Sequence, residues 1–201
     1  HVSARESVQA IREAKRSGVR VTAEVSPHHL TMTDEAVRGY NTHAKMKPPL
    51  CAEEDRLALL EGLEDGTIDC IATDHAPHTP TSKNSVFDHA PFGIIGMEPA
   101  FPVLYTTFVA TGRWTLDFLV ERMTISPARV MSADWGTLEV GRKADIALVQ
   151  LGTEYVFGLE HIGSKSRNCP WLGDKMLARI AGTIVSGDVR YKSEEVFGGA
   201  K

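Results

Sequence analysis

The fold is decided by Thr67-Ile68-Asp69-Cys70-Ile71-Ala72-Thr73, a short β-rich run that ends at Asp74-His75. A run of this length, preceded by Gly66, predicts a buried strand. Residues 53–64 directly before it are acidic at their start and apolar at Leu57, Leu60 and Leu63, which predicts a helix that Gly66 closes.

The same alternation continues on both sides of this run. Ser3 and Glu6 form a capping-box pattern that begins a helix, and Gly18 is placed to end it. Residues 19–25 alternate as a strand does and stop at Ser26-Pro27, and two further helices are expected at about 96–111 and 115–123. Helices and strands that alternate with short connections predict an α/β fold with a parallel sheet.

After about residue 134 the sequence pattern becomes typical of strands and turns. Residues 144–149 form an apolar run, and residues 180–191 predict two short strands around Ser186-Gly187-Asp188. We therefore predict two domains, residues 1–134 as the α/β part and residues 135–201 as part of a small β domain.

Composition excludes several classes of function. A formal net charge of −4 gives no electrostatic reason to expect nucleic acid or an anionic membrane as partner. No apolar run reaches the roughly 18 residues that a membrane span needs, and no secretory signal opens the chain. Cys51, Cys70 and Cys169 form no C-x-x-C pair, so a reducing cytoplasm is the expected setting, with Cys70 a core residue.

The strongest candidate site is Asp74-His75-Ala76-Pro77-His78, which follows the strand at the position where α/β folds place catalytic groups. The turn is expected to direct His75 and His78 to different sides. The alternative is that Asp74 only caps the next turn.

Other histidines near predicted strand ends are weaker candidates for the site. His28 and His29 also follow a strand, but neighbours on an extended segment point to opposite faces, so we favour a structural role for them. His1 precedes a helix at what resembles a strand-to-helix junction, and a neutral imidazole there suits zinc. Because the chain begins at His1 and runs straight into a helix, we expect it to be a segment of a longer protein.

Residues 79–89 are polar and short of apolar anchors, so they are either a mobile lid over the site or a plain surface loop. Gly93 and Gly96, which follow, would let the backbone approach a small ligand closely.

Taken together these motifs resemble the dihydroorotases, in particular the larger bacterial type, over almost the whole chain. The matching stretches are His1-Val2-Ser3, residues 21–30, residues 72–78, Ala90-Pro91-Phe92-Gly93, and Gly136-Thr137-Leu138 with Gly141, Ala144 and Asp145.

The resemblance implies the C-terminal portion of a distorted (β/α)8 TIM-type barrel, with His1 ending strand six and Asp74 ending strand eight, plus part of a flanking β-sandwich. It implies one or two zinc ions per complete site, with His1 and Asp74 as ligands and Asp74 as general base and then acid. His28 and His29 are not ligands in the family. Two ligands are too few for a catalytic zinc, so the site in this chain is incomplete.

Substrate contacts are implied for His78, Phe92 and Gly93, and for Lys47, which stands where the family usually has asparagine. A lysine has no acceptor and carries charge, so it either attracts a substrate carboxylate or marks a relaxed or lost activity.

The implied activity is reversible interconversion of dihydroorotate and N-carbamoyl-L-aspartate in pyrimidine biosynthesis, in the cytoplasm, with a homodimer as the family expectation. One alternative is another cyclic amidohydrolase, such as a hydantoinase or allantoinase. Another is a non-catalytic scaffold that binds aspartate carbamoyltransferase.

Overall fold

The computed structural model describes residues 1–198. Contacts divide the chain into two compact units. The first holds His1–Ala100 and Phe157–Gly173, and the second holds residues from 101 to 156 and from 174 on. A segment from the C-terminal part of the sequence thus completes the first unit.

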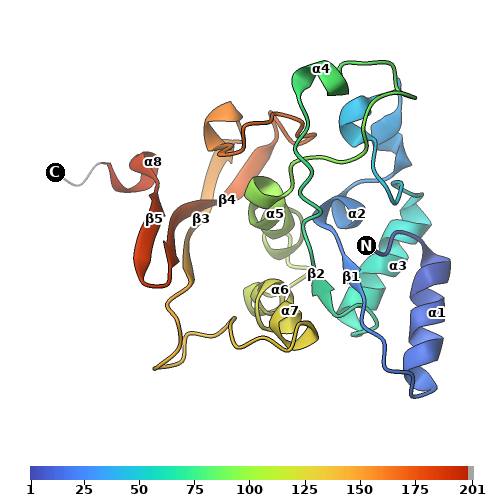
Figure 1. The fold of residues 1–201 in the computed structure, drawn as a ribbon, viewed down its shortest axis with the longest axis horizontal. Helices are drawn as coiled ribbons and strands as arrows, with labels where there is room; N and C mark the ends of the chain where they lie inside the picture. Colours follow the sequence, from blue (N-terminus) through green and yellow to red (C-terminus); the bar gives the residue numbers. More distant parts are fainter. Residues whose placement is uncertain (199–201) are drawn as a thin grey trace. The chain divides into compact units, whose positions relative to one another are not determined.

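Two long helices flank the strands of the first unit, α1 (Arg5–Arg16) and α3 (Glu53–Glu64), which lie side by side (Figure 1). Both were predicted from the sequence, and α3 has the predicted bounds. Val8 of α1 is buried, and its Cγ1 atom would lie 2.8 Å from a Cβ atom at Gly62, so a glycine in α3 lets the helices approach.

The predicted capping box of α1 is wrong. The N-cap residue is Ala4 and no side chain caps the helix, because the helix begins one residue later than the Ser3-Glu6 pattern requires. Gly18 does adopt the left-handed conformation, with φ of +79°, just after the helix ends.

The sheet of the first unit is short. β1 (Glu24–Val25) and β2 (Cys70–Ile71) pair in parallel, with Glu24 opposite Cys70. The strands are therefore shorter than the predicted runs 19–25 and 67–73. Cys70 is 3% exposed, which confirms it as a core residue, and parallel pairing across an intervening helix is what the alternation predicted.

Short helical turns fill the connections of the first unit. They are α2 (Pro27–Thr31), η1 (Asp34–Val37), η2 (Thr42–Ala44), α4 (Pro80–Lys83) and η4 (Leu159–His161). The sequence did not predict them. The extended conformation assumed for His28 and His29 is wrong, since both lie in α2, where Ser26 serves as N-cap.

Helices make up the earlier part of the second unit. α5 (Met97–Leu104) crosses the boundary between the units and continues as the π-helical turn η3 (Tyr105–Val109). α6 (Leu116–Met123) and the unpredicted α7 (Ile125–Val130) follow. The ring of Trp114 lies 4.2 Å from that of Phe108 and 5.2 Å from that of Phe118, centroid to centroid, which joins η3 to α6.

An antiparallel sheet forms the later part of the second unit. Its strands β3 (Ile146–Val156), β4 (Lys175–Val185) and β5 (Asp188–Lys192) lie in that order, and α8 (Glu194–Phe197) follows. β4 and β5 turn at Ser186 and Gly187, both with positive φ, which confirms the predicted pair of strands.

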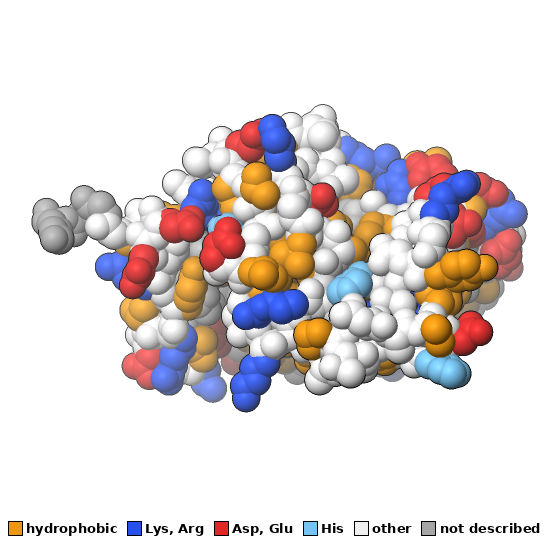
Figure 2. All heavy atoms as spheres, turned by 90° about the horizontal axis from the view of Figure 1, so that it is seen from above, with side chains coloured by type: hydrophobic (Ala, Val, Ile, Leu, Met, Phe, Trp, Pro, Cys, Tyr) orange, Lys and Arg blue, Asp and Glu red, His pale blue; other side chains and the backbone are white. Residues whose placement is uncertain are grey.

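The chain is thus a mixed α/β protein, as predicted. Among the residues that the structure describes, no helix has the length and apolarity to cross a bilayer. Figure 2 shows acidic and basic side chains intermixed on the face it draws, in keeping with the small net charge. The assignment of residues 1–134 to a barrel and 135–201 to a sandwich stays a prediction.

Candidate functional site

Backbone hydrogen bonds bring the two ends of the candidate site together. Val2 N donates to Glu24 O at 2.9 Å, which sets His1 beside β1. Ala72 N donates to Val25 O at 3.0 Å, which carries the pairing of β1 and β2 to the residues just before Asp74. His1 and Asp74 therefore lie on either side of β1, at the sheet edge where α/β proteins bind ligands.

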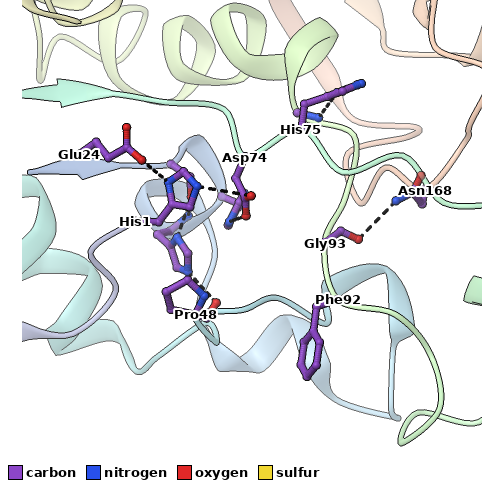
Figure 3. Close-up of polar contacts among 12 residues, drawn as sticks. His1, Glu24, Pro48, Asp74, His75, Phe92, Gly93 and Asn168 are labelled. Atoms are coloured by element: carbon purple, nitrogen blue, oxygen red, sulfur yellow. Dashed lines mark hydrogen bonds and ion pairs between the residues drawn. The ribbon is translucent and has the colours of Figure 1, made fainter. Parts of the chain in front are cut away.

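The side chains of His1, Glu24, His28 and Asp74 form one group, which we call the His1–Asp74 cluster (Figure 3). His1 Nδ1 lies 3.1 Å from Glu24 Oε1, and His1 Nε2 lies 3.4 Å from Asp74 Oδ1. The imidazole thus stands between two carboxylates. Their negative charge makes this position attractive to a cation.

Asp74 has an unusual backbone conformation for its type, with φ of +49°. Non-glycine residues adopt this region at a cost in free energy, and such positions gather at functional sites. Within the described chain, its carboxylate makes contacts to His1 and His28 and accepts no hydrogen bond from a backbone N–H, unlike a turn-capping aspartate.

His28 and His29 differ sharply although both are buried. His29 Nε2 donates to Pro48 O at 3.0 Å, so its Nδ1, 2.7 Å from Ser26 Oγ, accepts the hydroxyl proton. Both nitrogens of His28 lack a hydrogen-bond partner within the described residues, and its Nε2 lies 3.9 Å from Asp74 Oδ2. Burial lowers the pKa of His28 to about 3, so its ring is neutral.

The two histidines after Asp74 turn to different partners, as the sequence predicted. His75 Nδ1 accepts from Gly96 N at 3.1 Å and from Met97 N at 3.3 Å, at the start of α5. Figure 3 shows its ring directed away from Asp74. His78 Nε2 lies 2.9 Å from the carbonyl oxygen of Phe92, so the structure joins these two sequence-predicted site residues.

Two buried lysines anchor the segment that was predicted to be a lid or a plain loop. Lys83 Nζ donates to Pro91 O and Gly93 O, both at 3.0 Å, and is fully buried. Lys45 Nζ donates to three carbonyl oxygens between residues 87 and 90. Burial, and secondarily the charge of Lys45, lowers the pKa of Lys83 to about 8. The sequence did not indicate these anchors, because lysine is usually an exposed residue.

Lys47 is exposed, and its Nζ lies 5.8 Å from the centroid of the half-exposed Phe92 ring. Its ammonium group is thus beside Phe92 and open to solvent.

Gly93 and Gly96 do permit a close approach, but of the chain to itself. A Cβ atom at Gly93 would lie 2.5 Å from Ala76 Cβ, and one at Gly96 would lie 2.4 Å from Thr73 O. The approach of a ligand to these glycines stays a prediction.

The metal donors in this chain do not make a complete centre. No group of three or more His, Cys, Asp and Glu side chains that could hold a metal occurs in the described part of the chain. His1 and Asp74 converge, but a catalytic zinc usually has three protein ligands. The described residues therefore supply two donors that suit a divalent metal, not a complete set of ligands.

Sequence reasoning missed Glu24 and Asn168. Glu24 was treated as part of a strand, although its position at the end of that strand could have indicated it. The side chain of Asn168 is buried between residues 76–78 and 93, and no local pattern indicates such a contact.

Solved structures of known proteins share this fold. The chain superimposes on an L-hydantoinase (dihydropyrimidinase) from Arthrobacter aurescens with a TM-score of 0.85 and 28% identity, over 96% of this chain and 44% of that one. A dihydropyrimidinase from Brevibacillus agri NCHU1002 gives a TM-score of 0.86 at 22% identity over the same shares, which shows the fold alone.

Residues 1–190 match the amidohydrolase family, and the chain belongs to that family. Among curated relatives, the dihydroorotase of Bacillus subtilis (strain 168) is 50% identical over 192 residues, which are 96% of this chain and 45% of the relative. The dihydroorotase of Staphylococcus aureus (strain Mu50 / ATCC 700699) is 49% identical over 97% of this chain and 46% of its own length. The chain thus spans somewhat less than half of these relatives, whose name agrees with the resemblance read from the sequence.

Proposed function

We propose that this chain supplies part of the active site of a metal-dependent cyclic amidohydrolase that interconverts dihydroorotate and N-carbamoyl-L-aspartate in pyrimidine biosynthesis. The observation that carries the proposal is the convergence of His1 and Asp74, whose side chains meet at 3.4 Å from distant parts of the sequence. Membership of the amidohydrolase family and relatives named dihydroorotase support it.

Asp74 is the proposed acid–base group. Its carboxylate accepts a proton from the attacking water while a C–O bond forms at the ring carbonyl, and the same proton passes to the ring nitrogen as the C–N bond breaks. His1 Nε2 and Asp74 Oδ1 would be two ligands of a divalent cation, for which we propose zinc. That cation would polarise the amide carbonyl and lower the pKa of a bound water.

Substrate contacts are proposed for His78, Phe92, Gly93 and Lys47. The hydrogen bond between His78 and the Phe92 carbonyl supports the first three, since it makes them neighbours. The exposed ammonium group of Lys47 beside Phe92 would pair with the carboxylate of dihydroorotate.

A second candidate is hydrolysis of another cyclic amide, such as a hydantoin. The hydantoinase fold and the charge of Lys47, where an uncharged asparagine is usual in the dihydroorotases that the sequence resembles, favour it. A non-catalytic scaffold for aspartate carbamoyltransferase is the third reading, and the retention of both Asp74 and His78 speaks against it.

The remaining expectations are proposals of the same kind. Residues 1–134 would be the C-terminal part of a (β/α)8 barrel and residues 135–201 part of a β-sandwich, a proposal supported by the family match. Homodimerisation stays a family expectation. A cytoplasmic location is proposed from the sequence alone, in which the cysteines form no C-x-x-C pair.

The test uses the complete protein that carries this sequence. Hydrolysis is measured with dihydroorotate, hydantoin and allantoin, and bound zinc per chain is measured by elemental analysis. Asp74→Asn is expected to abolish turnover of dihydroorotate, while Asp88→Asn, at an exposed aspartate, leaves it unchanged. Turnover of hydantoin but not dihydroorotate would support the second candidate, and no turnover in a zinc-free protein would support the scaffold.

A further inference from the structure

Two proposed substrate-contacting segments are joined by residues that have no part in the His1–Asp74 cluster. Asn168 lies in the C-terminal segment that completes the first unit, and its side chain is 2% exposed. Its Oδ1 accepts from His78 N at 3.1 Å, and its Nδ2 donates to Ala76 O at 2.9 Å and to Gly93 O at 3.3 Å. Figure 3 shows the amide directed at the Gly93 carbonyl.

The orientation of this amide follows from its partners. Rotating it by half a turn would place Oδ1 against two carbonyl oxygens and Nδ2 against an N–H donor, so only one orientation satisfies all three groups. The backbone adds a fourth bond, because Ile95 N donates to Asn168 O at 3.0 Å. One buried residue thus holds both segments by side chain and main chain.

Lys83 fixes the second segment from another side. Its buried ammonium group donates to Pro91 O and Gly93 O, so Gly93 O accepts bonds from both Lys83 and Asn168. Gly93 N donates to Lys45 O at 2.8 Å. The N–H and the carbonyl of Gly93 therefore both bond to buried residues, and these bonds fix the position of its backbone.

From these contacts we propose that Asn168 and Lys83 are positioning residues, which hold residues 76–78 and 91–93 as one rigid surface for binding the cyclic amide substrate. The proposal rests on the proposed function, since it assigns that surface to substrate. Neither residue reaches the His1–Asp74 cluster by any contact found in the described chain. Their loss should therefore weaken substrate binding more than the chemical step.

The first experiment replaces Asn168 by aspartate in the complete, metal-loaded protein. Asn168→Asp keeps the acceptor for His78 N but removes the donors and sets a negative charge against two carbonyl oxygens. We expect KM for dihydroorotate to rise about tenfold or more while kcat changes less than about threefold, which marks lost ground-state binding. Asn84→Asp makes the same chemical change at an exposed position and should keep both constants.

A second measurement does not depend on turnover. Hydrogen–deuterium exchange of peptides covering residues 75–79 and 91–96 should become about tenfold faster or more in Asn168→Asp, because repulsion between the new carboxylate and the carbonyl oxygens of Ala76 and Gly93 loosens both segments. Peptides from α3 should exchange as in the parent protein. If Asn168→Asp does not fold, Lys83→Met takes its place in both measurements, and Lys165→Met serves as its exposed control.

The outcomes separate the two proposals. A parent protein that does not turn over dihydroorotate refutes the proposed substrate, and the exchange data alone then decide whether Asn168 and Lys83 hold the two segments together. An active parent protein whose folded Asn168→Asp and Lys83→Met variants keep its KM and its exchange pattern refutes the positioning role.

Discussion

Replacement of Lys83 by methionine should make the stability of the protein respond differently to pH. Methionine retains most of the apolar length of lysine but has no proton to lose. The folded pKa of Lys83 is about 8 against an ordinary value of 10.5, because burial and the nearby charge of Lys45 disfavour the ammonium form.

The sign and size follow from proton linkage. Between pH 8 and 10.5 the unfolded chain holds a proton on Lys83 that the folded chain has released, so the unfolding free energy contributed by Lys83 rises with pH. Each pKa unit corresponds to about 1.4 kcal/mol, so the full gain is about 3 kcal/mol across this window. The neutral amine still has two N–H groups, enough for the bonds to Pro91 O and Gly93 O.

The assay is urea unfolding of the parent protein and Lys83→Met at pH 7, 8, 9 and 10. The parent protein should gain stability relative to the variant above pH 8, and their difference should be constant below it. A carbon-13 shift titration of the Lys83 side chain gives the pKa directly. Lys165→Met should change stability by less than about 0.5 kcal/mol at pH 7, because Lys165 is exposed. A stability difference that stays flat up to pH 10 would refute the buried, shifted lysine.

Three further predictions test the rest of the site. Replacing His28 by leucine should leave stability in thermal unfolding unchanged or raise it by about 1 kcal/mol, since the buried ring nitrogens of His28 have no hydrogen-bond partners in the described chain. His29→Leu should instead lower stability by about 1–3 kcal/mol, because it removes two hydrogen bonds. Equal effects of the two changes would contradict this. Gly93→Ala should lower the free energy of unfolding by about 2–3 kcal/mol, because the added Cβ atom clashes and φ is positive. Gly112→Ala, where φ is positive but the space is open, should lower it by only about 1 kcal/mol. A Gly93→Ala variant as stable as the parent protein in thermal unfolding would contradict this. In the complete protein Asp74→Asn should lower kcat for dihydroorotate at least about a thousandfold, and a loss below tenfold would count against Asp74 as the acid–base group.

Local pattern was sufficient where one segment determines its own structure. The acidic start and apolar spacing of residues 53–64 predicted α3 to the residue, and Ser186-Gly187 predicted the turn between β4 and β5. In both cases the information lies within a few residues, in dipole and turn chemistry.

The local sequence pattern failed where the structure of a segment depends on a partner far along the chain. β propensity marked residues 19–25 as a strand, but only Glu24–Val25 have a paired neighbour, and pairing depends on a segment far along the chain. His28 and His29 show the same limit. Their helical turn begins at Ser26 and Pro27, a signal that was present in the sequence and was read as a strand end.

Polar composition gave the wrong basis for judging residues 79–89. A segment short of apolar residues has few hydrophobic anchors, but Lys83 supplies an anchor of another kind by donating to the carbonyl oxygens of Pro91 and Gly93. A buried ammonium group is costly, and its cost is offset only while those carbonyls stay in place. Movement of residues 91–93 would therefore expose Lys83 or leave its ammonium group without hydrogen bonds. The free-energy cost of that unbonded, buried charge favours one fixed conformation of residues 91–93.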